Sequence, residues 1–176
     1  MATFSGNMEL IRQRLAQKLQ ELPVILGEEV VNFSLENFDK QAWQGETEKP
    51  WAKRKNPTKW GKRDEEKRAI LVKTGAGRRS IRVVRTEQYK VFIGAGGEVA
   101  PYMRLHNYGF QGNVNQNVRP FQRKLKNGKV SNVSGFSRTI NQNIPKRQFI
   151  GGENEAPRLK ERLQKVVREE LNQIFK

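Results

Sequence analysis

The sequence contains no cysteine among its 176 residues and only one histidine, His106. The absence of cysteine excludes disulfides, thiolate metal sites and a cysteine nucleophile, and a single histidine excludes a metal site built from several histidines of one chain. No apolar run approaches the roughly 18 residues that span a bilayer, and the first ten residues lack the basic start and apolar stretch of a signal peptide. We therefore expect a protein that is neither exported nor bound to a membrane, and that carries no cofactor.

Acidic residues are scarce as well. The chain has 34 Lys and Arg against 18 Asp and Glu, for a net charge of +16, and no acidic residue occurs between Val99 and Gly152. A carboxylate pair for general acid–base catalysis cannot be placed in that stretch. His106 could act as a general base, but its neighbours supply neither a nucleophile nor an orienting carboxylate, so a hydrogen-bonded structural histidine is the favoured interpretation. We predict no catalytic residue.

Helices are predicted at both ends of the chain. Apolar residues recur at three- and four-residue steps over residues 8–22, as on one face of an amphipathic helix. Pro23 interrupts the pattern and suits the first turn of a new helix, so a second helix is predicted over residues 24–38. Residues 157–175 carry leucine, valine and isoleucine on one stripe and predict a C-terminal helix packed on a sheet.

The middle of the chain predicts strands. Residues 81–85 and 89–93 are β-branched, alternating runs that indicate an antiparallel hairpin. Residues 111–143 are rich in Asn, Gln, Gly and Ser and contain Asn127-Gly128, a strong signal for a tight turn, so we expect a long polar and basic hairpin there. Helices that flank a run of strands indicate an α+β fold with a small, mainly antiparallel sheet, formed by residues 1–176 as a single domain.

Residues 49–68 form a basic arm, predicted as a loop or extended segment, in which Lys and Arg alternate with Trp51 and Trp60. Such an arm can bind nucleic acid, because lysine and arginine neutralise phosphates and indole rings stack on bases. The sequence has no helix-turn-helix, RRM, KH or zinc-finger pattern. Trp43, Trp51 and Trp60 also fit anchors at a protein interface, where tryptophan and arginine are enriched, and we favour that interpretation.

Several blocks follow one another in a specific order: FDKQAWQGETEKPW at 38–51, ILVKTG at 70–75 with RRSI at 78–81, VFIG at 91–94, YMRLHNYG at 102–109, and IPKRQFIG at 144–151. In this order they resemble the phage virion morphogenesis family, the tail-completion proteins of tailed bacteriophages. The resemblance covers roughly residues 25–175. The sequence departs from the family at Gly77, where a leucine is usual, and in the length and polarity of residues 111–143.

The resemblance implies a non-enzymatic virion protein that forms a ring, for instance a hexamer, at the head-proximal end of the tail or in the neck and joins the tail to the head. Its partners would be copies of itself, the tail tube protein, neck or connector proteins, and packaged DNA through a basic lumen, with assembly in the cytoplasm of the bacterial host. The candidate interface residues are Trp43, Trp51, Trp60, Arg78, Arg79, Tyr102, His106, Arg147 and Phe149.

Arg147 and Phe149 are predicted as an anchor at a heterologous contact between subunits, the kind of contact that a ring requires. Phe149 would fill a pocket of the neighbour, and Arg147 would bridge to a carboxylate or a carbonyl. The alternative is an ordinary buried aromatic beside a solvent-facing arginine.

Two other functions stay open at the level of the sequence. One is a basic nucleic-acid-binding protein that contacts phosphates through the arm at 49–68 and the hairpin at 111–143. The other is a small nuclease that uses His106, which the shortage of nearby carboxylates disfavours. Because the excess charge lies mostly in predicted loops and hairpins, we expect it to mark docking surfaces for acidic virion proteins or a lumen near DNA.

Overall fold

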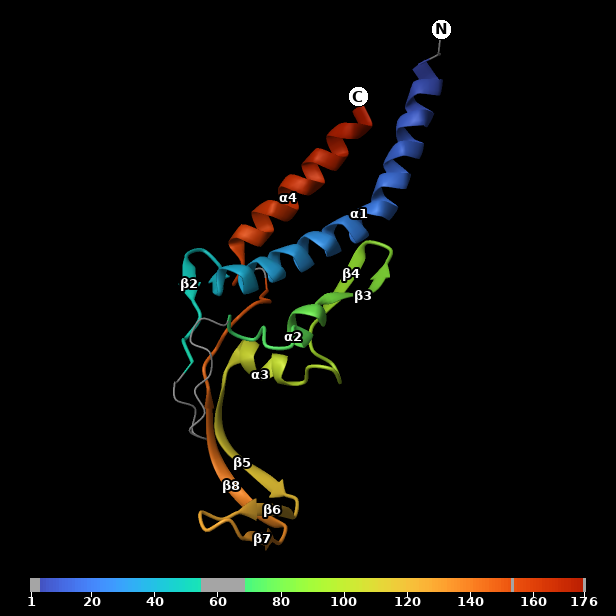
Figure 1. The fold of residues 1–176 in the computed structure, drawn as a ribbon. Helices are drawn as coiled ribbons and strands as arrows, with labels where there is room; N and C mark the ends of the chain where they lie inside the picture. Colours follow the sequence, from blue (N-terminus) through green and yellow to red (C-terminus); the bar gives the residue numbers. More distant parts are fainter. Residues whose placement is uncertain (1–3, 55–68, 153, 176) are drawn as a thin grey trace.

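A computed structural model describes residues 4–54, 69–152 and 154–175. Over these residues the chain is α+β, as predicted, but the strands form four separate two-stranded antiparallel sheets (Figure 1). The elements in chain order are α1 (Phe4–Lys40), β1 (Ala42–Gln44), β2 (Glu48–Pro50), α2 (Ala76–Arg79), β3 (Arg82–Glu87), β4 (Lys90–Gly94), α3 (Tyr102–Tyr108), β5 (Phe110–Val118), β6 (Phe121–Lys124), β7 (Val130–Val133), β8 (Phe136–Ile144), α4 (Pro157–Asn172) and the 3-10 turn η1 (Gln173–Phe175).

Helix α1 continues through Pro23, so the prediction of two separate helices is wrong. Proline removes one helical hydrogen bond and its ring clashes with the carbonyl one turn earlier, which bends a helix without necessarily ending it. Figure 1 shows α1 bending sharply between its two halves. Contacts on both sides of Pro23 hold the two halves in place, since Lys18 binds Glu170 of α4 at 2.6 Å and Gly27 lies against the β3–β4 hairpin.

The predicted hairpin of residues 81–93 is confirmed as β3 and β4, and it packs directly on α1. Gly27 of α1 makes this close approach possible. A Cβ atom added at Gly27 would lie 2.7 Å from Cγ2 of Val91 and 3.0 Å from Cγ2 of Val83. Both distances are shorter than normal van der Waals contact, so any larger side chain at this position would push the hairpin away from the helix.

The long hairpin predicted at 111–143 is also confirmed, and it consists of two ribbons in series. Strand β5 pairs with β8 over nine residues, and β6 pairs with β7 beyond them. The turn closes as predicted around Asn127-Gly128: the Gly128 amide donates to the Leu125 carbonyl at 3.0 Å, and Gly128 adopts a φ of +80°. Such a positive φ favours glycine. Figure 1 shows the hairpin projecting away from the helices.

Two buried clusters hold the helices and loops together. One surrounds Phe38, Trp51 and Phe149, and the other joins Phe33 of α1 to Leu159 of α4. The prediction that the C-terminal helix packs on a sheet is therefore wrong, because α4 packs mainly on α1. The β3–β4 sheet packs on α1, and Phe33 of α1 together with Ala156 and Leu159 forms the buried cluster through which α4 packs on α1.

Candidate functional site

The segment 147–150 contains the predicted anchor residues and is held inside the subunit by two buried amide side chains. Asn107 at the end of α3 accepts hydrogen bonds from the amides of Phe149 at 3.0 Å and Ile150 at 3.1 Å. From the opposite side, Asn37 of α1 donates to the Phe149 carbonyl at 3.3 Å. Sequence reasoning did not select either asparagine as a key residue, although Asn107 lies inside one of the blocks that resemble the family.

Phe149 is only 2% exposed and fills the core of its own subunit. Its ring packs against Phe38 at a centroid distance of 5.3 Å, and Phe38 in turn meets the edge of Trp51 at 5.1 Å. The structure therefore corrects the expectation that Phe149 inserts into a neighbouring subunit. It matches the alternative of an ordinary buried aromatic.

Arg147 is buried too, which neither alternative anticipated. Its Nε donates to the Ala52 carbonyl at 3.1 Å, and its Nη1 lies 3.2 Å from Nδ1 of His106. Burial lowers the pKa of Arg147 from its usual value, and the positive charge of Arg54 lowers it further. Arg147 thus ties the chain after β2 to α3 inside the subunit and does not point outward toward a partner.

The surroundings of His106 fit a histidine with a structural role. Burial, with a smaller contribution from the Arg147 charge, lowers its pKa to about 4. Its ring also meets the edge of Tyr102 at a centroid distance of 6.1 Å. Within the described ranges, no group of three or more acidic or histidine side chains is placed to hold a metal ion. None of the helices described there combines the length and the apolar character that a membrane-spanning helix needs.

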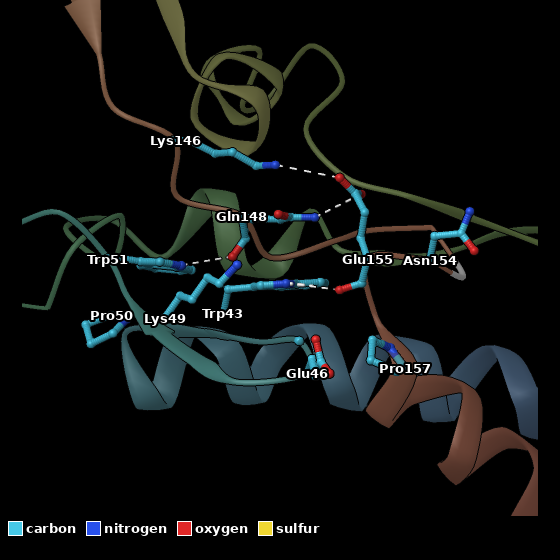
Figure 2. A pocket seen from close by; sticks show the side chains of 11 residues that line it. Trp43, Glu46, Lys49, Pro50, Trp51, Lys146, Gln148, Asn154, Glu155 and Pro157 are labelled. Atoms are coloured by element: carbon cyan, nitrogen blue, oxygen red, sulfur yellow. Dashed lines mark hydrogen bonds and ion pairs between the residues drawn. The ribbon is translucent and has the colours of Figure 1, made fainter.

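Trp43 and Trp51 line a pocket of about 400 Å³ between the β1–β2 ribbon and the chain that leads into α4 (Figure 2). Both indoles are buried and donate to backbone carbonyls, Trp43 to Glu155 at 3.2 Å and Trp51 to Gln148 at 2.9 Å. The Glu155 carboxylate accepts from the Gln148 side chain at 3.0 Å. These tryptophans join distant segments of one subunit and do not protrude as anchors, while Trp60 lies outside the described residues.

The remaining predicted interface residues lie around α2 and α3 and are at least partly exposed. Arg78 forms an ion pair with Asp39 at 2.9 Å, and Arg79 donates to the Thr74 carbonyl at 2.9 Å. Tyr102 shares a cavity of about 440 Å³ with His106 and Arg147. Of the predicted residues that the structure describes, Arg78, Arg79, Tyr102 and the half-buried His106 keep surface that a neighbouring molecule could contact.

An apolar groove of about 750 Å³ runs along α4, and the sequence motifs did not single it out. Val30 of α1 and Leu159, Leu163 and Val167 of α4 line it, with the exposed Lys160, Gln164 and Arg168 completing its wall. Leu163 and Val167 remain partly exposed, because α1 covers only part of the apolar stripe of α4. The strong amphipathic pattern of residues 157–175 was the available signal for this surface, but the pattern could not show that part of it stays open.

The sequence matches a known protein family over most of its length. A model described as the phage virion morphogenesis family matches residues 7–172, nearly the whole chain. The chain belongs to this family. It is thereby a structural bacteriophage virion protein, and the family resemblance seen in the sequence is confirmed. Comparisons with curated proteins and with solved structures give no significant match.

Gly77, where the resemblance led us to expect a leucine, has little room for a larger side chain. Gly77 is buried in α2, and a Cβ atom added there would lie 2.6 Å from Sδ of Met103. Met103 itself is fully buried in the cluster around Phe38. The side chain of Met103 thus occupies the space beside α2 where a larger residue would need to pack.

Proposed function

We propose that this protein is a non-enzymatic subunit that forms a homo-oligomeric ring at the head-proximal end of the phage tail or in the neck, where it completes the tail and joins it to the head. Membership of the phage virion morphogenesis family supports the proposal that the protein is a component of the virion. The observation that supports ring formation is the apolar groove left open along α4. Burial of apolar surface is the main driving force for such association.

A closed ring needs two different complementary surfaces on each subunit. The groove along α4 supplies one. The other is the β3–β4 hairpin, whose exposed apolar residues Val84 and Tyr89 are 64% and 65% exposed and are joined by Phe92 at 39%. Figure 1 shows α4 and the β3–β4 hairpin on different sides of α1, the arrangement that suits head-to-tail contact between copies.

The test uses the purified full-length chain, negative-stain electron microscopy and native mass spectrometry. Val167→Asp places a charge in the groove, and Val84→Asp places one on the hairpin; we expect each variant alone to lose rings. Asn172→Asp, which adds the same charge at the exposed end of α4, is the matched control and should keep them. Circular dichroism shows that each variant is folded.

A mixture of the two variants gives the sharper readout. Val167→Asp retains an intact hairpin, and Val84→Asp retains an intact groove. In the mixture the hairpin of the first variant can therefore still bind the groove of the second, and the product should be heterodimers that cannot close into a ring. A wild-type chain that stays monomeric at high concentration would contradict the ring, as would folded single variants that still assemble.

The position in the virion is tested separately. Tail preparations from a phage that carries Val167→Asp should contain tails without this protein at the head-proximal end, and few of them should join heads. The tail tube protein and the neck or connector proteins are the proposed partners there, with assembly in the cytoplasm of the bacterial host. Normal head joining with the protein absent from tails and necks would rule out this role.

A further inference from the structure

All charged side chains of the long hairpin have the same sign. Residues 110–144 contain no Asp or Glu, and their basic residues gather toward the distal end. Five of them lie on or beside the β6–β7 ribbon and are exposed: Arg119, Arg123, Lys124, Lys126 and Lys129. None of these five forms an ion pair with a carboxylate in the part of the chain that the structure describes.

The β6–β7 ribbon lies far from most of the carboxylates that the structure describes (Figure 1). The β5–β8 stem pairs nine residues on each strand, and Figure 1 shows it holding the ribbon away from the helices, where most of the described acidic residues lie. At about 3.4 Å per residue the stem is about 30 Å long. That length is several times the screening distance of roughly 8 Å at physiological salt, so the carboxylates of the described helices do not cancel the positive field at the tip.

The stem is built to hold the ribbon in a defined position. On one face of β5 and β8, polar side chains bond across the two strands at 2.7–3.1 Å, and the pairs are Asn113–Asn141, Asn115–Thr139 and Asn117–Ser137. Cross-strand pairs of this kind stabilise a two-stranded ribbon. The β5–β8 stem therefore holds the charged β6–β7 ribbon in a defined position at its end.

We infer that the β6–β7 ribbon binds duplex DNA through its phosphate backbone, without reading the sequence. Lysine, which supplies three of the five exposed charges, is depleted at protein interfaces but is a common phosphate contact. The Asn, Gln and Ser side chains of the ribbon are also typical donors to phosphate and sugar. A two-stranded ribbon fits the major groove, which is about 12 Å wide.

An acidic virion protein is the competing partner. Phe121, Phe136 and Val130 lie on or beside the ribbon and are 45%, 44% and 60% exposed, so residues suited to a protein interface are present there as well. Protein interfaces are built around buried aromatic and arginine anchors in pockets. The charge of the tip nevertheless favours DNA, because residues 110–144 contain no carboxylate and lysine supplies most of the exposed charge there. DNA binding by the ribbon requires neither a ring nor the groove along α4, so it can fail or succeed independently of the proposed function.

The experiment measures binding of the full-length chain to a fluorescent 25-base-pair duplex of arbitrary sequence, by anisotropy between 50 and 200 mM NaCl. The tip variant changes Arg123, Lys124, Lys126 and Lys129 to Gln. The control variant changes the same residue types at exposed positions elsewhere, namely Arg14, Lys49, Lys73 and Lys90. Each variant lowers the net charge of +16 by four, so only the position of the charge differs.

For the wild type, five phosphate contacts predict a slope of log K against log salt near −4.5, at about −0.9 per contact. The tip variant should reduce that slope to about −1 and weaken binding at 100 mM NaCl by about 100-fold, since four of the five contacts are lost. The control variant should keep the wild-type slope and lose less than about threefold in affinity.

Two results would overturn the inference. Equal losses of DNA affinity in the tip and control variants would show that the net charge of the protein, and not the ribbon, governs binding. Displacement of the DNA by poly-glutamate at equal charge concentration would show a surface suited to acidic protein. Both variants carry exposed substitutions, and thermal unfolding verifies that they remain folded.

Discussion

The guanidinium of Arg147 donates from Nη1 to Nδ1 of His106 across 3.2 Å. Arginine can only donate, so Nδ1 must accept and the imidazole proton must lie on Nε2. The Arg147 backbone amide also donates to the His106 carbonyl at 2.6 Å. The two residues are thus joined twice, and the contact requires a neutral histidine.

This contact predicts that the protein loses stability as the pH falls from 7 to 5. The pKa of His106 is lowered to about 4 in the folded state. As the pH falls, His106 is therefore protonated first in the unfolded chain, near pH 6.5, which favours unfolding. The stabilisation is complete above pH 6.5 and is lost progressively as the pH falls toward 4. We expect a loss of about 1–2 kcal/mol in the free energy of unfolding between pH 7 and 5, measured by urea denaturation.

His106→Asn is the control for this effect. The asparagine side-chain oxygen can accept from Arg147 but does not titrate, so the variant should show a flatter stability profile between pH 7 and 5. A profile identical to that of the wild type would show that another group causes the pH dependence.

Asn107→Ala should be strongly destabilising, because it leaves the amides of Phe149 and Ile150 without their acceptor. One buried and one half-buried unsatisfied donor predict a loss of about 2–4 kcal/mol in the free energy of unfolding. Asn143→Ala, at an exposed position on β8, should change it by less than about 0.5 kcal/mol. Equal effects of the two substitutions would show that Asn107 does not hold this segment.

Gly27→Ala tests the contact between α1 and the β3–β4 hairpin. Alanine favours a helix over glycine by about 1 kcal/mol, but its Cβ would clash with Val91 and Val83. We expect overpacking to dominate, for a net loss of about 1–2 kcal/mol in thermal or urea unfolding. In a Val91→Ala background the same change should cost less or become stabilising, and a cost independent of Val91 would contradict the proposed packing.

Arg162 of α4 links the two long helices through a bidentate pair with Glu36 of α1, at 2.8 and 2.9 Å. The side chains are 39% and 38% exposed, so we expect a modest coupling of about 0.5–1 kcal/mol from a double-mutant cycle with Arg162→Met and Glu36→Gln. The coupling should shrink in 1 M NaCl. A coupling above about 2 kcal/mol that does not change with salt concentration would indicate a buried pair.

Sequence patterns were sufficient wherever neighbouring residues decide the structure. The hairpin around Asn127-Gly128 follows from alternation and from the turn that this pair favours, and the strands at 81–93 follow in the same way. The amphipathic stripe of residues 157–175 predicted helix α4. The order of short blocks along the chain pointed to the family.

The sequence by itself also determined the lack of thiol chemistry and the uncompensated charge of residues 110–144, since both follow from composition alone. Only the tertiary structure decided that α1 passes through Pro23, that α4 packs on α1, and that Arg147 and Phe149 are buried. These outcomes depend on which distant segments meet and exclude water. Asn37 and Asn107 hold residues more than 40 positions away along the chain, and local periodicity carries no information about contacts at that range.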